Sequence, residues 1–194
     1  GVTTNRIARW DGLAWHPLAD GLNGVTNDLI VYNDNLIAAG SFTGSGEVLL
    51  ERAARWDGVS WHAMPGWPQT VTALVEWRGS LLGTTGFEIR QWDGAAWQPF
   101  EPRPDISIKD LVVVDDELYA AGNPTKRFTA EGWVALPHVE RTGNPNSVAV
   151  EALGSFNGSL FAAGDFTHAG EFSSAYVARW TRICPVGDTD CDGA

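Results

Sequence analysis

The chain has 194 residues, 44% of them hydrophobic, with 22 glycines, 10 tryptophans and a formal net charge of −11 at pH 7. This hydrophobic content excludes a disordered chain, and the negative charge disfavours nucleic acids and anionic membrane surfaces as partners. No stretch approaches the roughly 20 apolar residues of a membrane-spanning helix, so we expect no membrane insertion. Many glycines together with many aromatic residues indicate short strands joined by tight turns.

A Trp-Asp-Gly motif, followed three residues later by a second tryptophan, begins near the N-terminus and recurs along the chain. The complete copies are Trp10–Trp15, Trp56–Trp61 and Trp92–Trp97. A fourth copy keeps aromatic residues at Phe128 and Trp133, and a fifth begins at Val177–Trp180. The spacing between copies varies, which indicates loops of different length inserted between constant structural units.

A segment rich in small residues lies between the aromatic pairs, and each copy follows an apolar run. Its copies are Asn35–Thr43, Ser80–Thr84, Glu117–Thr125 and Ser159–Thr167. We therefore predict four strands per unit: the apolar run, the small-residue segment, a strand that ends at the first tryptophan and a strand that begins at the second. The intervening Asp-Gly predicts a hairpin, because both residues tolerate positive φ.

Four-stranded units of roughly 40 to 50 residues in tandem are typical of a β-propeller. The predicted fold class is all-β, a β-propeller of four-stranded antiparallel blades over residues 1–182. The propeller has about four blades or is an arc of a larger ring. Both ends of the chain fall within a motif, so we interpret it as a fragment or an incomplete arc. The alternative is that strands from the two termini, or self-association, complete a blade.

The repeats resemble a known class of propeller sequence. The pattern Ala-Arg-Trp-Asp-Gly-x-x-Trp, the Gly21–Gly24 connector and Leu-x-Ala-Ala-Gly-Ser-Phe-Thr are similar to kelch-like repeats. The likeness is to those of large secreted bacterial proteins and of fungal cortical-marker surface proteins, and it covers about residues 5–180. It implies a propeller and an extracellular location, but no particular activity. The paired glycines of typical kelch blades are absent.

The tail, residues 183–194, resembles the start of a dockerin-type calcium loop. Asp188, Asp190 and Asp192 stand at loop positions 1, 3 and 5, and Gly193 stands at position 6, where the loop turns sharply. Alternate carboxylates let three oxygens converge on one hard cation. Because the later acidic ligand of such a loop falls outside this sequence, we expect only weak Ca²⁺ binding, in the millimolar range.

The cysteines of the chain are Cys184 and Cys191, both in the tail. Their restriction to the tail is compatible with secretion. In an oxidising compartment they would form a disulfide across a small loop, and otherwise they are two free thiols.

The tryptophans suggest a glycan ligand, since aromatic faces stack on sugar rings. Most of them occupy repeat positions, however, and a side chain repeated once per blade is expected to pack between blades. Trp67 and Trp77 lie off the pattern. Trp67 falls in a predicted loop, Pro65–Pro68, and is therefore the candidate for an exposed ligand platform.

No spacing in the sequence identifies a catalytic or metal centre before the tail. His16 and His62 are equivalent repeat positions, so we expect them in different blades. The acidic pair Asp115-Asp116 is expected in a turn. The arginine before the first tryptophan, as in Arg55, is expected to pair with the aspartate of the motif, here Asp57.

These observations favour an extracellular or cell-surface β-propeller that binds or organises a protein or glycan, is part of a larger secreted protein, and has no catalysis of its own. Apart from Ca²⁺ at the tail, we expect no cofactor. One alternative is a carbohydrate-binding, lectin-like propeller. The other is a polysaccharide hydrolase or lyase, which would need carboxylates from different blades to converge in one pocket.

Overall fold

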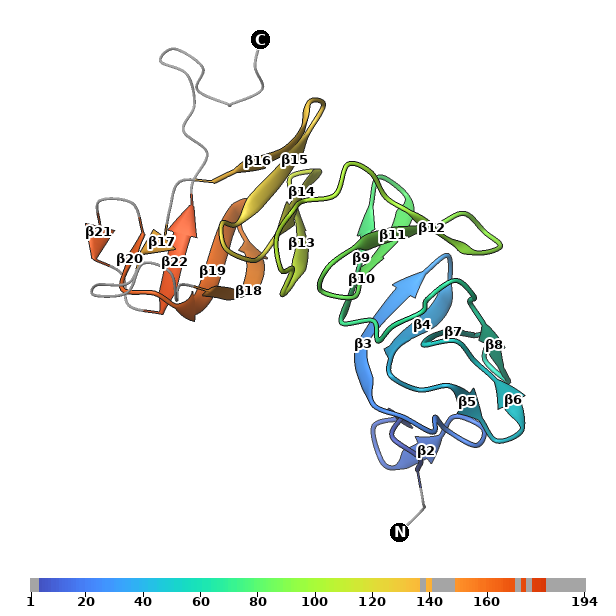
Figure 1. Ribbon diagram of the computed structural model, residues 1–194. Coiled ribbons are helices and arrows are strands. Elements are labelled where there is room, and N and C mark those ends of the chain that lie inside the picture. The colour runs from blue at the N-terminus through green and yellow to red at the C-terminus, as the bar shows by residue number, and fades with distance from the viewer. Residues whose placement is uncertain (1–3, 137–138, 141–148, 170–171, 174–175, 181–194) are drawn as a thin grey trace. The chain divides into compact units, whose positions relative to one another are not determined.

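The computed structural model describes residues 4–136, 139–140, 149–169, 172–173 and 176–180 (Figure 1). The chain divides into two compact units, residues 1–111 and 112–194. Every regular element of the described residues is a β-strand. They include no helix of the length and apolarity that crossing a bilayer requires. The predicted boundary between residues 182 and 183 lies outside the described residues.

The first unit opens with a two-stranded hairpin, called here the N-terminal hairpin. Its strands are β1 (Ala8–Trp10) and β2 (Trp15–Pro17). The first blade follows as an antiparallel sheet in the order β3-β4-β7-β8. Its strands are β3 (Thr26–Tyr32), β4 (Asn35–Gly40), β7 (Ala53–Trp56) and β8 (Trp61–Ala63). A small hairpin, β5 (Gly44–Ser45) and β6 (Val48–Leu49), is inserted between β4 and β7 and lengthens this repeat.

The second blade completes the first unit and has the same topology, with the strand order β9-β10-β11-β12. Its strands are β9 (Ala73–Trp77), β10 (Ser80–Thr84), β11 (Ile89–Trp92) and β12 (Trp97–Pro99). It lacks an inserted hairpin between its second and third strands. The variable spacing of the motif copies in this unit therefore reflects an insertion in a loop, as the sequence predicts.

The second unit contains a three-stranded sheet and the third blade, except for Leu111, the first residue of that blade. The third blade consists of β13 (Leu111–Val114), β14 (Glu117–Ala120), β15 (Lys126–Thr129) and β16 (Gly132–Ala135). The three-stranded sheet has the order β18-β19-β22, with β18 (Ala149–Phe156), β19 (Ser159–Asp165) and β22 (Val177–Trp180). A smaller sheet contains β17 (Val139–Glu140), β20 (His168–Ala169) and β21 (Phe172–Ser173).

The strand register is the same from repeat to repeat. In the first blade Leu36 lies opposite Trp56, and Trp56 lies opposite Trp61. In the three-stranded sheet Leu160 lies opposite Trp180. The third strand ends at the first tryptophan and the fourth begins at the second, as predicted. The predicted fold class is confirmed: the chain is all-β and is built from four-stranded antiparallel β-propeller blades.

In the first unit the core lies between consecutive repeats, because the first and second blades bury their second tryptophans, Trp61 and Trp97, against residues that follow the preceding repeat. Trp61 packs in one cluster with Leu18 and Leu22, which follow the N-terminal hairpin. Trp97 packs in another with Met64 and Trp67, which follow the first blade. Burying one such Leu or Met side chain contributes about 1.5–3 kcal/mol. A single blade therefore leaves part of its core exposed unless a neighbour covers it.

Candidate functional site

The Trp-Asp-Gly hairpins join the third and fourth strands, and their aspartates hold the turn closed. In the first blade, Oδ1 of Asp57 accepts hydrogen bonds from the backbone N–H groups of Val59 and Ser60, both at 2.8 Å. Gly58 has φ of 101°, a backbone conformation that disfavours L side chains. The sequence correctly predicts the hairpin, but only the glycine adopts positive φ. The aspartate acts through its side chain.

The second carboxylate oxygen of each motif aspartate binds the residue after the second tryptophan. Oδ2 of Asp57 lies 2.6 Å from Nε2 of His62, and the N-terminal hairpin repeats this pair at 2.6 Å between Asp11 and His16. Asp93 accepts instead from Gln98, at 2.9 Å. Each histidine thus belongs to its own hairpin, and the two are not brought together.

Backbone hydrogen bonds lower the pKa of all three aspartates from the usual range. For Asp57 the largest contribution comes from the N–H of Ser60, followed by that of Val59 and then by His62. Asp11 has the same causes in the same order. The pKa of Asp93 is lowered by its two backbone donors and then by Gln98. A carboxylate held ionised in this way is a poor general acid.

The repeated arginine does not bind the motif aspartate, so that prediction is wrong. Nη1 of Arg55 donates to Oδ1 of Asn35 at 3.0 Å, and Asn35 is the first residue of the second strand. In the third blade, Nη1 of Arg127 donates to Oε1 of Glu117 at 3.1 Å, again at the start of the second strand. This side-chain position therefore links the third strand to the second.

The predicted exposure of Trp67 is also wrong. Its side chain is only 2% exposed and packs in a core cluster that contains residues of both the first and the second blade. The ring centroids of Trp67 and Trp97 are 5.2 Å apart, and the guanidinium of Arg90 lies 5.6 Å from the Trp67 ring centroid. Arg90 also donates to the carbonyl of Gly66. A sugar ring could not stack on an indole that is enclosed in this way.

The two buried indoles share an unusual polar feature. The Nε1 atoms of Trp67 and Trp97 are buried, and neither has a hydrogen-bond partner among the described residues. By contrast, Nε1 of Trp61 donates to the carbonyl of Leu18 at 3.2 Å. The stability of this cluster therefore comes from ring packing and the nearby guanidinium.

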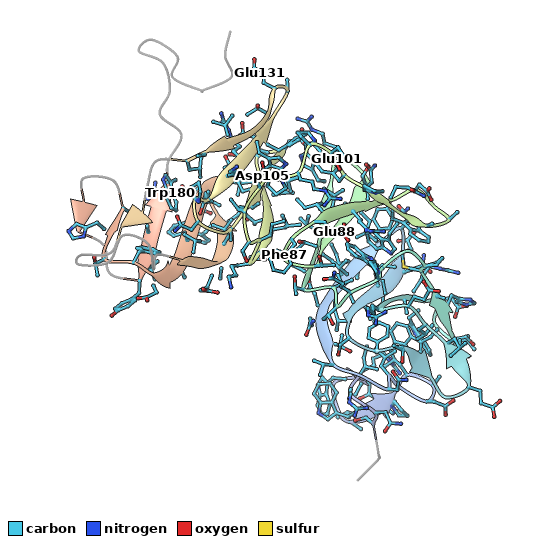
Figure 2. All side chains as sticks on the ribbon, in the orientation of Figure 1. Phe87, Glu88, Glu101, Asp105, Glu131 and Trp180 are labelled. Carbon is cyan, nitrogen blue, oxygen red and sulfur yellow. The ribbon has the colours of Figure 1, made fainter. Side chains whose placement is uncertain are left out.

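Arginines engage two glutamates of the second blade and the segment that follows it, Glu88 and Glu101, both of which are labelled in Figure 2. Nε of Arg90 lies 3.0 Å from Oε1 of Glu88, and Nη2 of Arg103 lies 3.8 Å from its Oε2. Nε of Arg103 lies 3.3 Å from Oε1 of Glu101. Both glutamates are therefore engaged by arginines. Their arrangement fits an ion-pair network better than the acid and base pair of a glycosidase.

A second buried polar group lies in the third blade. Oη of Tyr119 donates to Oε2 of Glu117 at 2.6 Å, and Arg127 binds the other oxygen of this carboxylate. Burial, followed by the hydrogen bond to Glu117, raises the pKa of Tyr119 to about 12. The phenol therefore stays protonated at neutral pH and acts as a hydrogen-bond donor.

The N-terminal hairpin exposes both of its tryptophans, although a side chain repeated once per blade is expected to pack between blades. Trp10 is 50% exposed and Trp15 is 59% exposed, whereas the equivalent second tryptophans Trp61 and Trp97 are 3% and 2% exposed. The ring centroids of Trp10 and Trp15 are 5.3 Å apart and the rings are tilted by 50°. The N-terminal hairpin thus presents a paired aromatic surface to solvent.

Two hollows of the first unit adjoin this hairpin. A hollow of about 430 Å³ is lined by Asn5, Arg6, Asp20, Leu22, Asn23 and Gly46. A groove of about 450 Å³ is lined by residues 6–8, which lead into β1, and by residues 26–29, the first half of β3. Most polar groups of the first hollow serve the fold. Asn5, for example, donates to the carbonyl of Asp20 at 2.7 Å.

The described residues contain no group of three or more histidine, cysteine or acidic side chains positioned to hold a metal. The candidate calcium ligands Asp188, Asp190 and Asp192 lie outside the described residues, as do Cys184 and Cys191. Both the calcium site and the disulfide stay predictions.

The fold and the hairpins define a β-propeller-blade protein whose repeated polar side chains serve mainly the turns and the links between strands. No protein-family model and no curated protein sequence matches this chain. The resemblance to kelch-like repeats therefore stays a prediction from the motifs.

Proposed function

We propose that this protein is an extracellular β-propeller module that binds or organises other molecules and performs no catalysis of its own. One observation carries the proposal: the polar side chains of the repeat are occupied within their own blades. Asp57 closes its turn and binds His62, and Arg55 binds Asn35. A repeat used in this way supplies a scaffold, and recognition falls to the exposed positions that differ between copies.

Binding and turnover should be measured on the same samples of the full chain. The protein is incubated with soluble neutral and acidic polysaccharides, while affinity electrophoresis measures binding and a reducing-end assay measures cleavage. We expect no new reducing ends and no unsaturated products. Enzyme-dependent release of oligosaccharides would overturn the proposal and favour the hydrolase or lyase alternative.

A carbohydrate ligand is the second candidate, favoured by the exposed pair Trp10 and Trp15. Two tilted indoles 5.3 Å apart offer one face to stack on a sugar ring and an edge that packs beside it. Because both rings are already half exposed, truncating them should leave the first unit folded. Trp15→Ala should therefore reduce glycan binding at least about tenfold, a loss of about 1.4 kcal/mol.

Leu13→Ala is the matched control, because Leu13 lies in the same hairpin loop and is 91% exposed. It should bind glycans like the unmodified protein. Equal losses in both variants, or no binding to any polysaccharide by folded protein, would remove the carbohydrate hypothesis. We also retain as proposals a weak Ca²⁺ site at Asp188, Asp190 and Asp192 and an extracellular location.

A further inference from the structure

The turn between β18 and β19 consists of an asparagine followed by a glycine. Phe156 lies opposite Ser159, so Asn157 and Gly158 form a two-residue hairpin turn, with φ of 48° and 68°. Both turn residues are exposed. A glycine after an asparagine leaves the next backbone nitrogen unhindered, because glycine has no Cβ beside it. This nitrogen can therefore attack the side-chain amide of the asparagine.

Attack at this position would convert the amide into an acid without an enzyme or a cofactor. The backbone nitrogen of Gly158 bonds to Cγ of Asn157 and loses its proton, and the side-chain nitrogen leaves as ammonia. The resulting five-membered succinimide is opened by water at either of its two carbonyl carbons. Opening gives aspartate or isoaspartate. The net reaction therefore consumes one water, releases one ammonia and leaves at residue 157 a carboxyl group that is ionised at neutral pH.

The chain contains a second Asn-Gly pair, Asn23-Gly24, which the fold restrains. Both asparagines are exposed, so exposure does not distinguish them. Oδ1 of Asn23 accepts hydrogen bonds from the backbone N–H groups of Thr43 and Gly44, at 2.7 Å and 3.0 Å, and Nδ2 donates to Oγ1 of Thr43 at 3.1 Å. Gly24 packs so closely on Phe42 that an added Cβ would lie 2.6 Å from the Phe42 Cα. Cyclisation at Asn23 must therefore first break three hydrogen bonds and move packed backbone.

The Asp-Gly pairs of the repeat hairpins are protected by a different feature. An aspartate forms the same ring only from its protonated carboxyl group, because a carboxylate is a poor electrophile. Oδ1 of Asp57 accepts from two backbone N–H groups, and Asp11 and Asp93 accept in the same way. These hydrogen bonds lower the pKa of the three aspartates and keep them ionised at neutral pH. Ring formation is therefore slow in these three hairpins.

Asn157 has neither kind of restraint. Among the described residues, no hydrogen bond involves its side chain. The two turn residues also lie outside the paired positions of β18 and β19, so the tip of the hairpin opens without separating the strands. We propose that Asn157 is a site of spontaneous deamidation, whose products are aspartate and isoaspartate at residue 157. This modification does not depend on the proposed function.

The modification would add charge beside a second carboxylate. In the same unit, the turn between β13 and β14 contains Asp115, and a Cβ added at Gly158 would lie 3.2 Å from Oδ2 of Asp115. A negative charge at the neighbouring residue 157 therefore repels Asp115. Isoaspartate also lengthens the backbone of the turn by one carbon, which disturbs the pairing of Phe156 with Ser159. Deamidation should thus weaken the contact between the third blade and the three-stranded sheet.

Peptide mapping by mass spectrometry tests the proposal on the full chain, incubated in its folded state at mildly alkaline pH. We expect acid at residue 157, divided between aspartyl and isoaspartyl peptides, to accumulate at least about tenfold faster than at Asn23. In urea, where the fold no longer holds Asn23, both asparagines should react at comparable rates. The urea sample therefore separates the effect of the fold from that of the Asn-Gly sequence.

Thr43→Val is a matched control, because it removes the hydroxyl that binds Asn23 and keeps the shape of the side chain. It should speed the deamidation of Asn23 and leave the rate at Asn157 unchanged. An unreactive Asn157 in the folded chain, or equal rates at the two asparagines in the absence of urea, would overturn the proposal.

Two further variants test the effect on the neighbouring turn. Asn157→Asp, which reproduces one of the two products, should lower the urea midpoint of the full chain. The loss should be smaller in an Asp115→Asn background, because the repelling charge is then absent. Equal losses in the two backgrounds would contradict the predicted repulsion from Asp115.

Discussion

The Nε2 atom of His62 lies 2.6 Å from Oδ2 of Asp57, across the turn between the third and fourth strands of the first blade. An ionised carboxylate only accepts hydrogen bonds, so Nε2 carries the proton. The other oxygen of Asp57 accepts from two backbone N–H groups. One side chain thus ties the turn to the start of the fourth strand, and the N-terminal hairpin repeats the arrangement with Asp11 and His16.

The first prediction concerns the stability of the fold at acidic pH. Since the pKa of Asp57 is lowered in the folded state, the ionised carboxylate stabilises the fold above the unfolded pKa of about 4. This stabilisation is lost as pH falls through the folded pKa, which is lower still. Asp57→Asn should therefore be less stable than the unmodified chain at pH 6, by an amount that shrinks below about pH 4. Urea unfolding at a series of pH values measures the difference.

Asp93→Asn separates the two causes of this effect. Asp93 has the same backbone donors but binds the neutral Gln98 in place of a histidine. Because the backbone donors make the largest contribution in both hairpins, its stability deficit should shrink over the same acidic range. A pH-dependent deficit in Asp57→Asn alone would show that His62, and not the turn, dominates.

The turns between the first and second strands allow two matched substitutions whose expected effects on stability have opposite signs. Asn33 and Asp34 both have positive φ, of 47° and 60°, and the equivalent Asn157 and Gly158 have 48° and 68°. Glycine adopts this conformation without the steric cost that other residues incur. Asp34→Gly should therefore stabilise the first unit by about 0.5 kcal/mol.

Gly79→Ala is the matched opposite change in the second blade. Gly79 has φ of 72°, and an added Cβ would meet nothing within 4 Å, so its effect reports backbone strain alone. We expect a loss of about 1 kcal/mol, seen as a lower urea midpoint with unchanged m-value. A neutral result would mean that the turn rearranges on substitution.

The sequence is most informative where local chemistry decides the structure. Trp56 and Trp61 flank an Asp-Gly turn, so both strand ends and the hairpin between them follow from six consecutive residues. Small residues next to a leucine likewise mark the second strand, as at Leu36. These signals repeat, and agreement between copies makes the fold class predictable although each strand is short.

The wrong predictions involve contacts between distant residues. Trp67 follows Pro65 and Gly66 and looks like a loop residue, but Trp97 of the next repeat covers it. Arg55 is close to Asp57 in sequence, yet it donates to Asn35 on the neighbouring strand. Burial in a repeat protein depends on the adjacent repeat, which a motif read in isolation does not show.

One repeated signal could have revealed the interface between repeats. The third residue after each second aromatic is apolar: Leu18, Met64, Phe100 and Leu136. Leu18 and Met64 cover Trp61 and Trp97, and Leu136 shares a cluster with Trp180. Aligning the copies beyond the tryptophans would have predicted these contacts. The exposure of Trp10 could not be predicted from its motif, because the motif is the same in every copy.

The tail allows a prediction about metal removal. If Asp188, Asp190 and Asp192 are the calcium ligands, Ca²⁺ should bind in the millimolar range, and Asp190→Asn should weaken it at least about tenfold. A chelator should leave the thermal midpoint of the first unit unchanged, since its described residues include no group of three acidic, histidine or cysteine side chains placed for a metal. Calorimetric titration and thermal unfolding measure the two effects. A steep fall in the midpoint would place calcium in the propeller instead.

The last prediction compares Trp61 with Trp15, which have the same place in their repeats and opposite environments. Trp61 is buried against Leu18 and Leu22, so Trp61→Ala leaves a cavity between the N-terminal hairpin and the first blade. We expect a loss of about 3–5 kcal/mol in unfolding free energy. Trp15 is largely exposed, so Trp15→Ala should cost less than about 1 kcal/mol. Urea unfolding at low protein concentration, where any associated copies dissociate, compares the unfolding free energies of the two variants. Equal losses in the two variants would show that Trp15 is covered in solution, and so contradict the exposure on which its proposed glycan contact depends.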